Sequence, residues 1–362
     1  MERLPICLVG CGGMGNRHIL GMAALAGTGI SNIDLVAVCD LRADYAERAA
    51  AEAERVLGRR PRVHLGIEAA IADPGVAAFD VCTEVAAHLP VALPALAARK
   101  PVLCEKPLAL TVRGARAMID AAWQNGTILA TAENYRRDPP NRLAKAVIDA
   151  GLLGHIHMMV QFSAGGSDRI IITPWRHMRE RGGIGVDVVV HYTDIIQYYL
   201  GEFESVQGFG FIAEPIRYSR NGASMPHPAY QQQQAEMPEK LEATAEDSMV
   251  AIFRMKSGVL VQLGHLPSGP GHDWYQRSVH GRLGSLHVPH DRRGGAPVLR
   301  RADGELSGKQ LMKALPDFEL DDVASPTFAR DGVEYDLPFV TSDAGQIANE
   351  LYDFARAVLG NS

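Results

Sequence analysis

The chain has 362 residues, a length that corresponds to about two domains. Hydrophobic residues make up 47% of it and charged residues 22%, which is typical of a globular protein and excludes a disordered, collagenous or disulfide-stapled chain. The formal net charge is −6, and neither a basic stripe for nucleic acid nor an apolar run of about 18 residues for a membrane span is present.

The N-terminus and the cysteines indicate a cellular compartment. The first apolar run, Leu4 to Val9, begins without the charged leader and cleavage site of a secretory signal. None of the five cysteines forms a CxxC pair, so we interpret them as small buried hydrophobic residues in a reducing environment. We therefore expect a cytoplasmic protein with no membrane partner and no nucleic-acid partner.

The first 132 residues alternate short apolar runs with Ala-rich stretches of helical length. This alternation is typical of βαβ units and predicts a doubly wound parallel sheet in a Rossmann-type domain, residues 1–132. The predicted strands are Ile6–Val9, Leu35–Cys39, Phe79–Thr83, Val102–Cys104 and Ile128–Ala132. The predicted helices are Met14–Ala26, Ala43–Leu57, Pro90–Arg99 and Val112–Asn125.

The pattern changes after Asp138, and residues 133–362 are predicted to form a second, α+β domain. A helix over Arg142–Ala150 precedes longer runs that favour β-branched or alternating residues and predict a large, mostly antiparallel open sheet. These runs are His155–Phe162, Val206–Ile212, Ser248–Met255, Val259–His265 and Arg277–His280. A final helix over 344–359 is expected to pack back on the first domain.

Two long stretches, 213–246 and 289–331, show no regular pattern. Loops of this length are uncommon in compact domains. We expect lids, oligomer arms or surface insertions there.

A GxGxxG motif, Gly10-Cys11-Gly12-Gly13-Met14-Gly15, follows the first predicted strand and opens the first predicted helix. In a dinucleotide-binding turn the first glycine allows the tight bend, the second lets the pyrophosphate approach, and the third lets helix and strand pack closely. The free N–H groups of the helix N-terminus then face the phosphates. The motif therefore predicts a dinucleotide cofactor, and a glycine-rich turn without a ligand is the alternative.

Asp40 ends the second predicted strand and is followed by Leu41 and Arg42. A carboxylate at this position accepts hydrogen bonds from the ribose hydroxyls of the adenosine and repels a 2′-phosphate, which favours NAD over NADP. Arg42 complicates this prediction, since an arginine there can pair with a 2′-phosphate.

Cys104-Glu105-Lys106-Pro107 follows the strand Val102–Cys104 at its carboxyl end, the edge where ligands bind in open parallel sheets. A lysine there can stabilise negative charge that develops on a substrate oxygen. The alternative is a solvated lysine at a strand end.

A glycine turn at 182–185 leads into a helix that carries Asp187, His191 and Asp194. Asp187 and His191 are four residues apart and share one helix face, so the carboxylate can orient the imidazole for proton transfer at neutral pH. The alternative is a buried polar pair at the start of the helix.

Together these motifs resemble the Gfo/Idh/MocA family, the group of glucose–fructose oxidoreductase and inositol 2-dehydrogenase. The resemblance covers essentially the whole chain. Glu105-Lys106-Pro107 followed by the Asp187-xxx-His191 helix is its specific part; Asn134-Tyr135-Arg136-Arg137 and Trp175-Arg176 also resemble family segments. The resemblance implies a C-terminal sheet that forms homodimers or homotetramers, and sugars or cyclitols as substrates.

The resemblance also implies roles for individual residues. Lys106, Asp187 and His191 are the catalytic candidates, and Tyr135, Trp175 and Arg176 join them as candidates for substrate binding. Glu84 departs from the family pattern, which usually has a proline after the threonine. The expected cofactor contacts are Gly10, Gly12, Gly13, Met14, Gly15, Asp40, Leu41, Arg42, Thr83, Glu84, His88, Glu105, Lys106 and Asn134.

The predicted activity is NAD-dependent transfer of a hydride between a secondary hydroxyl of a sugar, glycoside or cyclitol and the nicotinamide. A glycosidase or lyase that works by transient oxidation and elimination, recycling the cofactor, is the alternative. A non-catalytic dinucleotide sensor would have no need of Lys106, Asp187 and His191 together. No metal is predicted, because the spacings of His265, His272, His287 and His290 match no common zinc pattern.

Overall fold

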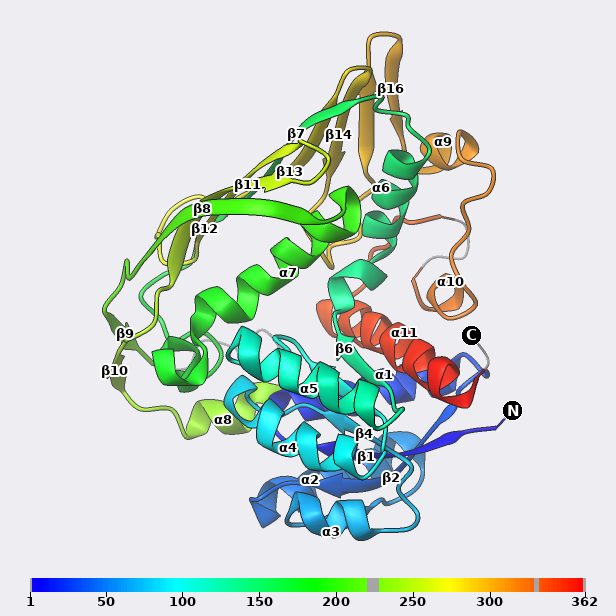
Figure 1. Ribbon diagram of the computed structural model, residues 1–362, viewed down its shortest axis with the longest axis vertical. Coiled ribbons are helices and arrows are strands. Elements are labelled where there is room, and N and C mark those ends of the chain that lie inside the picture. Colours follow the sequence, from blue (N-terminus) through cyan, green and yellow to red (C-terminus); the bar gives the residue numbers. More distant parts are fainter. Residues whose placement is uncertain (1, 220–227, 329–331, 361–362) are drawn as a thin grey trace. The chain divides into compact units, whose positions relative to one another are not determined.

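The computed structural model describes residues 2–219, 228–328 and 332–360 (Figure 1). The chain divides into two units. The first comprises Met1–Asn134, Met225–Glu236 and Asp343–Ser362, and the second comprises Tyr135–Ser224 and Met237–Ser342. Within the described ranges, no helix has the length and apolar character needed to cross a membrane.

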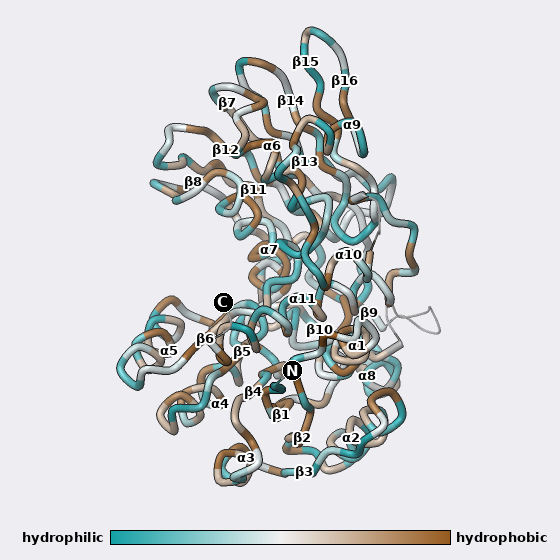
Figure 2. Tube along the Cα trace, turned by 90° about the vertical axis from the view of Figure 1, so that its right-hand side faces the viewer, coloured by the Kyte–Doolittle hydropathy of each residue, from teal (hydrophilic) through white to brown (hydrophobic). Residues whose placement is uncertain are grey.

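The first unit contains a six-stranded parallel sheet with the strand order β3-β2-β1-β4-β5-β6, the order of a dinucleotide-binding Rossmann fold. The central strands β2, β1, β4 and β5 are short, largely apolar and buried, because helices cover both faces of the sheet (Figure 2). The order reverses between β1 and β4, which makes the carboxyl ends of these strands the expected ligand edge. The strands are β1 (Leu4–Val9), β2 (Ile33–Cys39), β3 (Arg62–His64), β4 (Ala78–Val81), β5 (Val102–Glu105) and β6 (Leu129–Ala132).

The helices of this unit are α1 (Gly13–Gly27), α2 (Ala43–Leu57), α3 (Ile67–Ala72), α4 (Val85–Ala97) and α5 (Val112–Gln124), with the part of α11 (Phe339–Leu359) that begins at Asp343. α11 packs tightly on α1, since a Cβ at Gly21 would lie 2.4 Å from Cγ2 of Ile347. The side chain of Asn32 also donates to the carbonyl oxygen of Tyr352 at 3.0 Å.

Two features of this unit differ from the sequence-based expectation. α4 begins at Val85 and not at Pro90, where the prediction placed its start. Prolines usually lie in the first turn of a helix, but Pro90 and Pro94 lie inside α4. β3 and α3 were not predicted, since three and six residues are too few to show a period. All five cysteines are buried and free, as expected.

The second unit contains an eight-stranded sheet with the order β16-β15-β14-β13-β7-β12-β11-β8. Every neighbouring pair is antiparallel except β12 with β7, so the predicted mostly antiparallel sheet is confirmed and with it the fold class. The strands are β7 (Ile156–Ala164), β8 (Phe203–Phe211), β11 (Ser248–Met255), β12 (Leu260–Leu266), β13 (Trp274–Gly281), β14 (Gly284–Val288), β15 (Val298–Arg301) and β16 (Gly304–Ser307).

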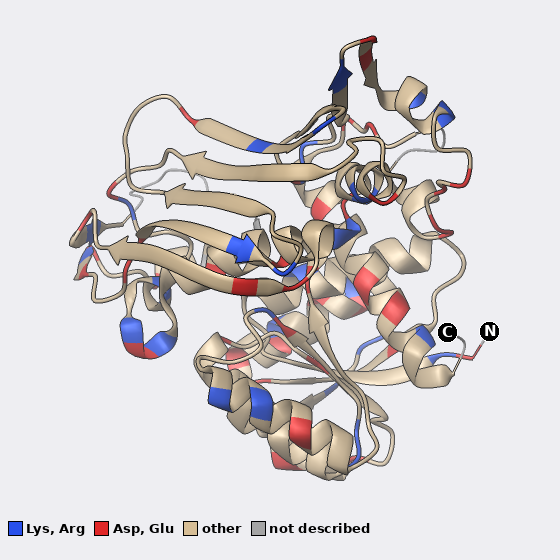
Figure 3. Cartoon of the chain, turned by 45° about the horizontal axis from the view of Figure 1, so that its top comes forward, with Lys and Arg blue, Asp and Glu red and all other residues tan. Residues whose placement is uncertain are grey.

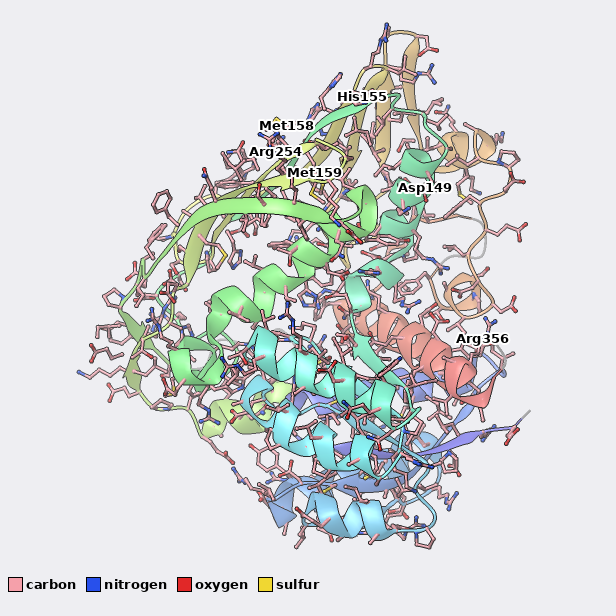
Figure 4. The ribbon with its side chains drawn as sticks, in the orientation of Figure 1. Asp149, His155, Met158, Met159, Arg254 and Arg356 are labelled. Atoms are coloured by element: carbon pink, nitrogen blue, oxygen red, sulfur yellow. The ribbon has the colours of Figure 1, made fainter. Side chains whose placement is uncertain are left out.

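One face of this sheet packs against α6 (Pro139–Asp149) and α7 (Gly183–Leu200), and the other face is open (Figure 1). Neighbouring residues of β7 show the difference. Met159 is fully buried in the core under the helices, whereas Met158 points to the open face and is 37% exposed (Figure 4).

The prediction of irregular structure over 213–246 and 289–331 was wrong in part. The first stretch contains the antiparallel pair β9 (Ile216–Tyr218) and β10 (Lys240–Glu242), a 3-10 turn η4 (Pro228–Tyr230) and α8 (Gln231–Ala235). The second contains the β15–β16 hairpin, α9 (Gly308–Lys313) and α10 (Ala324–Thr327). Elements of three to six residues are too short for a periodic pattern to reveal. Residues 220–227 and 329–331 lie outside the described residues.

Candidate functional site

The glycine turn between β1 and α1 has the geometry that the motif predicts. Gly10 has φ +92°, and a Cβ there would lie 2.7 Å from the backbone nitrogen of Thr83 in the β4–α4 turn. A Cβ at Gly15 would lie 2.0 Å from the carbonyl oxygen of Gly10. Neither position can carry a side chain, because the turn packs directly on its neighbours. The turn therefore suits the close approach of a pyrophosphate to the N-terminus of α1.

Asp40 links this turn to the end of β2. Its Oδ2 accepts from the backbone nitrogen of Cys11 at 2.7 Å, and its Oδ1 accepts from the backbone nitrogen of Arg42 at 2.9 Å. The carboxylate is thereby fixed beside the glycine turn, where the ribose of an adenosine dinucleotide binds in this fold. Leu41 beside it is 87% exposed.

Lys106 follows β5 directly, and the carboxylate of Glu105 supports its backbone. Oε2 of Glu105 accepts from the backbone nitrogen of Lys106 at 2.9 Å, and Oε1 lies 3.2 Å from Nε2 of His18 on α1. The Lys106–Pro107 peptide bond is cis. Glu105 is buried, so in this structure its side chain braces Lys106; its expected contact with the cofactor stays a prediction.

His18, which no sequence motif indicates, lies at the centre of a buried charged cluster. Its Nδ1 is 2.8 Å from Oδ2 of Asp80, and its Nε2 is 3.8 Å from Oε1 of Glu350 on α11. Burial alone would lower the pKa of His18, but the carboxylate of Asp80 raises it well above the ordinary value. Ligand atoms of this cluster lie close enough to hold a metal ion, but both ring nitrogens of His18 already pair with carboxylates.

His88 joins the two loops that flank this edge. Its Nδ1 lies 2.9 Å from the carbonyl oxygen of Pro107 and its Nε2 lies 3.1 Å from that of Thr83. Burial lowers the pKa of the ring, which favours its neutral form. The neutral ring donates to one of the two carbonyl oxygens and so fixes one of the loops; the expected contact of His88 with the cofactor stays a prediction, as does that of Glu84, the residue before α4.

Asn134 is the last residue of the first unit before the chain enters the second. Its side chain is buried, and Oδ1 has no hydrogen-bond partner among the described residues. A buried acceptor of this kind suits a ligand donor. Together with the glycine turn and Asp40, it shows that the donor and acceptor set of this unit fits a dinucleotide.

In the second unit, α7 begins at a glycine turn that brings Asp187 into a buried ion pair. Gly183 has φ +74°, and a Cβ there would lie 2.5 Å from Cβ of Ala245. Nε of Arg176 donates to Oδ2 of Asp187 at 2.7 Å, and Nη1 of Arg176 donates to Oγ1 of Thr173 at 2.6 Å. The guanidinium of Arg176 also lies 4.4 Å from the ring centroid of Trp175. Three of the predicted site residues are thus brought together.

His191, one turn after Asp187, stacks on Tyr135. The ring centroids are 3.9 Å apart and the planes differ by 4°. The guanidinium of Arg292 lies 5.1 Å from the same Tyr135 ring. Arg292 was missed because it lies in a stretch without a pattern. Asp194, which follows Asp187 and His191 on α7, pairs with Arg136, with 2.5 Å between Oδ2 and Nε.

The fold and the two sets of polar residues define an NAD-dependent oxidoreductase. The model of the oxidoreductase family with the NAD-binding Rossmann fold matches residues 4–133, and the model of the GFO/IDH/MocA C-terminal domain matches residues 141–287. The chain belongs to the Gfo/Idh/MocA family. Its members include dehydrogenases of sugars and cyclitols, and NAD is the cofactor.

Three curated relatives are 27–29% identical to the chain over the aligned residues. Levoglucosan dehydrogenase of Pseudarthrobacter phenanthrenivorans is 27% identical over 84% of this chain and 78% of its own length. 1,5-Anhydro-D-fructose reductase of Ensifer adhaerens is 29% identical over 74% of each. Myo-inositol 2-dehydrogenase of Thermotoga maritima is 28% identical over 55% of each.

Solved structures have the same fold. A levoglucosan dehydrogenase in complex with NADH and L-sorbose matches with a TM-score of 0.76 at 23% identity, over 99% of this chain and 90% of that one. An oxidoreductase domain protein from Kribbella flavida matches with a TM-score of 0.78 at 22% identity, over 98% and 91%.

Proposed function

We propose that the chain oxidises a secondary hydroxyl of a cyclic polyol, a sugar, glycoside or cyclitol, and catalyses the reverse reduction. The observation that carries this proposal is the position of Lys106, at the carboxyl end of β5, on the sheet edge that also carries the glycine turn and Asp40. Bound NAD supplies the hydride acceptor.

Two residues act on the reacting hydroxyl in this proposal. His191 takes its proton as general base, and the ammonium group of Lys106 stabilises the negative charge that develops on the oxygen. The stack on Tyr135 holds the plane of the His191 ring, so that rotation does not move its nitrogens away from the substrate.

Asp187 and Arg176 form the polar side of the substrate site in this proposal. The Asp187 carboxylate, which Arg176 holds in place, accepts a hydrogen bond from a neighbouring hydroxyl of the substrate. Trp175 offers an apolar ring to the C–H surface of the substrate. Levoglucosan, 1,5-anhydro-D-fructose and inositol, the compounds that the relatives are named for, are all cyclic and hydroxylated, which supports this substrate class.

The test is a panel of sugars, anhydro sugars, cyclitols and aryl glycosides incubated with NAD. NADH is followed by absorbance, and released aglycone is followed in the same samples. A dehydrogenase accumulates NADH in proportion to the oxidised substrate. Release of aglycone without NADH would overturn the proposal in favour of elimination with a recycled cofactor.

We also propose that the open face of the eight-stranded sheet is an interface between copies of the chain. The exposed apolar side chains on this face belong to β7, β8, β11, β12 and β13, and the strands are largely free of charged residues (Figure 3). An exposed apolar patch on a soluble chain marks an interaction site. The patch consists of Met158, Phe209, Phe211, Val250, Ile252, Leu260 and Trp274.

A further inference from the structure

A segment far from the glycine turn in sequence covers it in the first unit. Residues 228–236, which we call the strap, include η4 and α8 and are contacted by α1. A Cβ at Gly13 would lie 2.1 Å from two ring carbons of Tyr230, and Nη1 of Arg17 donates to the hydroxyl of Tyr230 at 3.3 Å. The strap therefore lies on the turn that receives the phosphates.

Gln233 extends this contact along the turn. A Cβ at Gly12 would lie 2.9 Å from Nε2 of Gln233, so the carboxamide lies on the face of Gly12 that a dinucleotide-binding turn leaves open for the pyrophosphate. Oε1 of Gln233 is buried and has no hydrogen-bond partner within the described ranges. The strap is thus in a position to influence how the cofactor binds.

The end of the strap reaches the residues that select between NAD and NADP. Oε2 of Glu236 accepts from Nη1 of Arg42 at 2.7 Å, and Oε1 accepts from Nη2 of Arg42 at 3.0 Å. The hydroxyl of Tyr45 donates to Oε2 of Glu236 at 3.2 Å. This is a two-pronged pairing of a guanidinium with a carboxylate, the same geometry that a guanidinium uses to bind a phosphate.

Asp44 binds the other edge of the Arg42 guanidinium. Nε of Arg42 donates to Oδ1 of Asp44 at 3.2 Å and Nη2 donates to Oδ2 at 2.9 Å, and Asp44 is shared with Arg48. A 2′-phosphate beside Asp40 would have to draw the Arg42 guanidinium away from Glu236. The phosphate would then face the carboxylates of Asp40 and Glu236. A 2′-hydroxyl requires no such rearrangement, because Asp40 alone can accept its hydrogen bond.

We propose that Glu236 is a specificity-determining residue, which holds Arg42 in a two-pronged pair and thereby makes the site reject the 2′-phosphate of NADP. This role belongs to the strap, not to the β2–α2 turn in which Asp40 and Arg42 lie. The Arg42–Glu236 pair is about half exposed and contributes little to stability, so its effect is on the ligand. The proposal rests on the cofactor and not on the identity of the polyol.

The test compares the affinities of the unmodified protein and of Glu236→Gln for NAD and NADP by titration calorimetry, without substrate. The substitution keeps the size of the side chain and removes its charge. We expect NADP to bind about tenfold more tightly and NAD to change by less than about twofold, because only NADP uses the released guanidinium. The gain should shrink at high ionic strength, since it is electrostatic and exposed.

Two further variants make the result specific. In an Arg42→Met background, Glu236→Gln should leave NADP affinity unchanged, because the guanidinium that it releases is gone. Glu52→Gln removes an equivalent charge from α2, where Glu52 pairs with Arg55 at the surface. This substitution should also leave the affinity for NADP unchanged. An unaltered NADP affinity in Glu236→Gln, or an equal gain in either of these variants, would overturn the proposal. Because binding alone is measured, a failure of the proposed polyol oxidation would leave this test intact.

Discussion

Arg176 and Asp187 form a buried ion pair at the start of α7, with 2.7 Å between Nε and Oδ2 and side chains that are 10% and 7% exposed. The pair connects the 3-10 turn η2 (Pro174–His177) to the helix that carries His191. Removal of one partner takes a buried, charged hydrogen bond away from the other, which costs more than the loss of an exposed pair. The same bond therefore stabilises the second unit and fixes a carboxylate of the candidate active site.

We expect Arg176→Met to lower the free energy of unfolding by about 3–5 kcal/mol. The matched control is Arg136→Met, which breaks the more exposed pair with Asp194 on the same helix and should cost about 1 kcal/mol or less. Denaturant unfolding of both variants measures the difference. In an Asp187→Asn background, Arg176→Met should lower the free energy of unfolding markedly less, since a neutral carboxamide has already replaced the buried carboxylate. Equal losses in the two backgrounds would mean that Arg176 and Asp187 are not coupled.

The Arg176–Asp187 pair also marks a limit of what the sequence shows. Arg176 and Asp187 were each named as candidates, but nothing in their spacing indicates a bond across a 3-10 turn. By contrast, Lys106 and the glycine turn could be placed, because apolar strands and a fixed motif spacing put both at one sheet edge. Because periodicity and motif spacing indicate local structure, Lys106 and the glycine turn could be predicted from the sequence.

Long-range contacts account for what was missed. His18 looks like an ordinary helix residue until the fold brings Asp80, Glu105 and Glu350 around it. Glu236 is 194 positions from Arg42, in a stretch expected to be irregular. Neither contact has a local signal, because each depends on which segments the tertiary fold places side by side.

Replacement of Lys106 tests the role of its ammonium group. We expect Lys106→Met to lower kcat by about 10²–10⁴-fold, since stabilisation of the developing oxyanion is lost. The dissociation constant for NAD, measured by titration calorimetry, should remain within a few-fold, because the glycine turn and Asp40 are intact. A variant with unchanged kcat would remove Lys106 from the mechanism.

Replacement of His191 tests the general base. In the direction of polyol oxidation, the rate should rise with pH as a histidine base loses its proton. We expect His191→Asn to flatten this rise in kcat/KM as well as to lower kcat. Tyr135→Phe is the control, since it keeps the ring that stacks on His191 and should retain the pH profile. A rise that persists in His191→Asn would mean that another group accepts the proton.

The open sheet face gives a prediction about assembly. Phe209 is 84% exposed and Ile252 is 57% exposed, on neighbouring strands of the same face. We expect Phe209→Glu combined with Ile252→Glu to convert an oligomer into monomers, because two charges would be desolvated in the interface. Light scattering during gel filtration measures the mass. Trp123→Glu, at an 84% exposed site of the first unit, is the control and should leave the mass unchanged; a monomeric unmodified protein would contradict the proposed interface.

The buried ring of His177 predicts a loss of stability in acid. Its Nε2 accepts from the backbone nitrogen of Ile171 at 2.9 Å, and burial, aided by the nearby charge of Arg217, lowers its pKa from 6.5 to about 4. Between these two values the unfolded chain binds the proton and the folded chain does not, so the free energy of unfolding falls as the pH falls through this window. The contribution of His177 is at most about 3 kcal/mol.

The measurement is denaturant unfolding at about pH 7.5 and about pH 5. His177→Gln keeps an acceptor for the Ile171 N–H but cannot bind a proton, so the difference between the two pH values should become smaller in this variant. His155→Gln replaces an exposed histidine and should leave the difference as it is in the unmodified protein. His265, whose pKa burial lowers to about 4, and His88, whose pKa burial also lowers, contribute to the acid sensitivity that remains in His177→Gln. If His177→Gln and His155→Gln show the same difference in unfolding free energy between the two pH values, the His177 ring does not cause the loss of stability in acid.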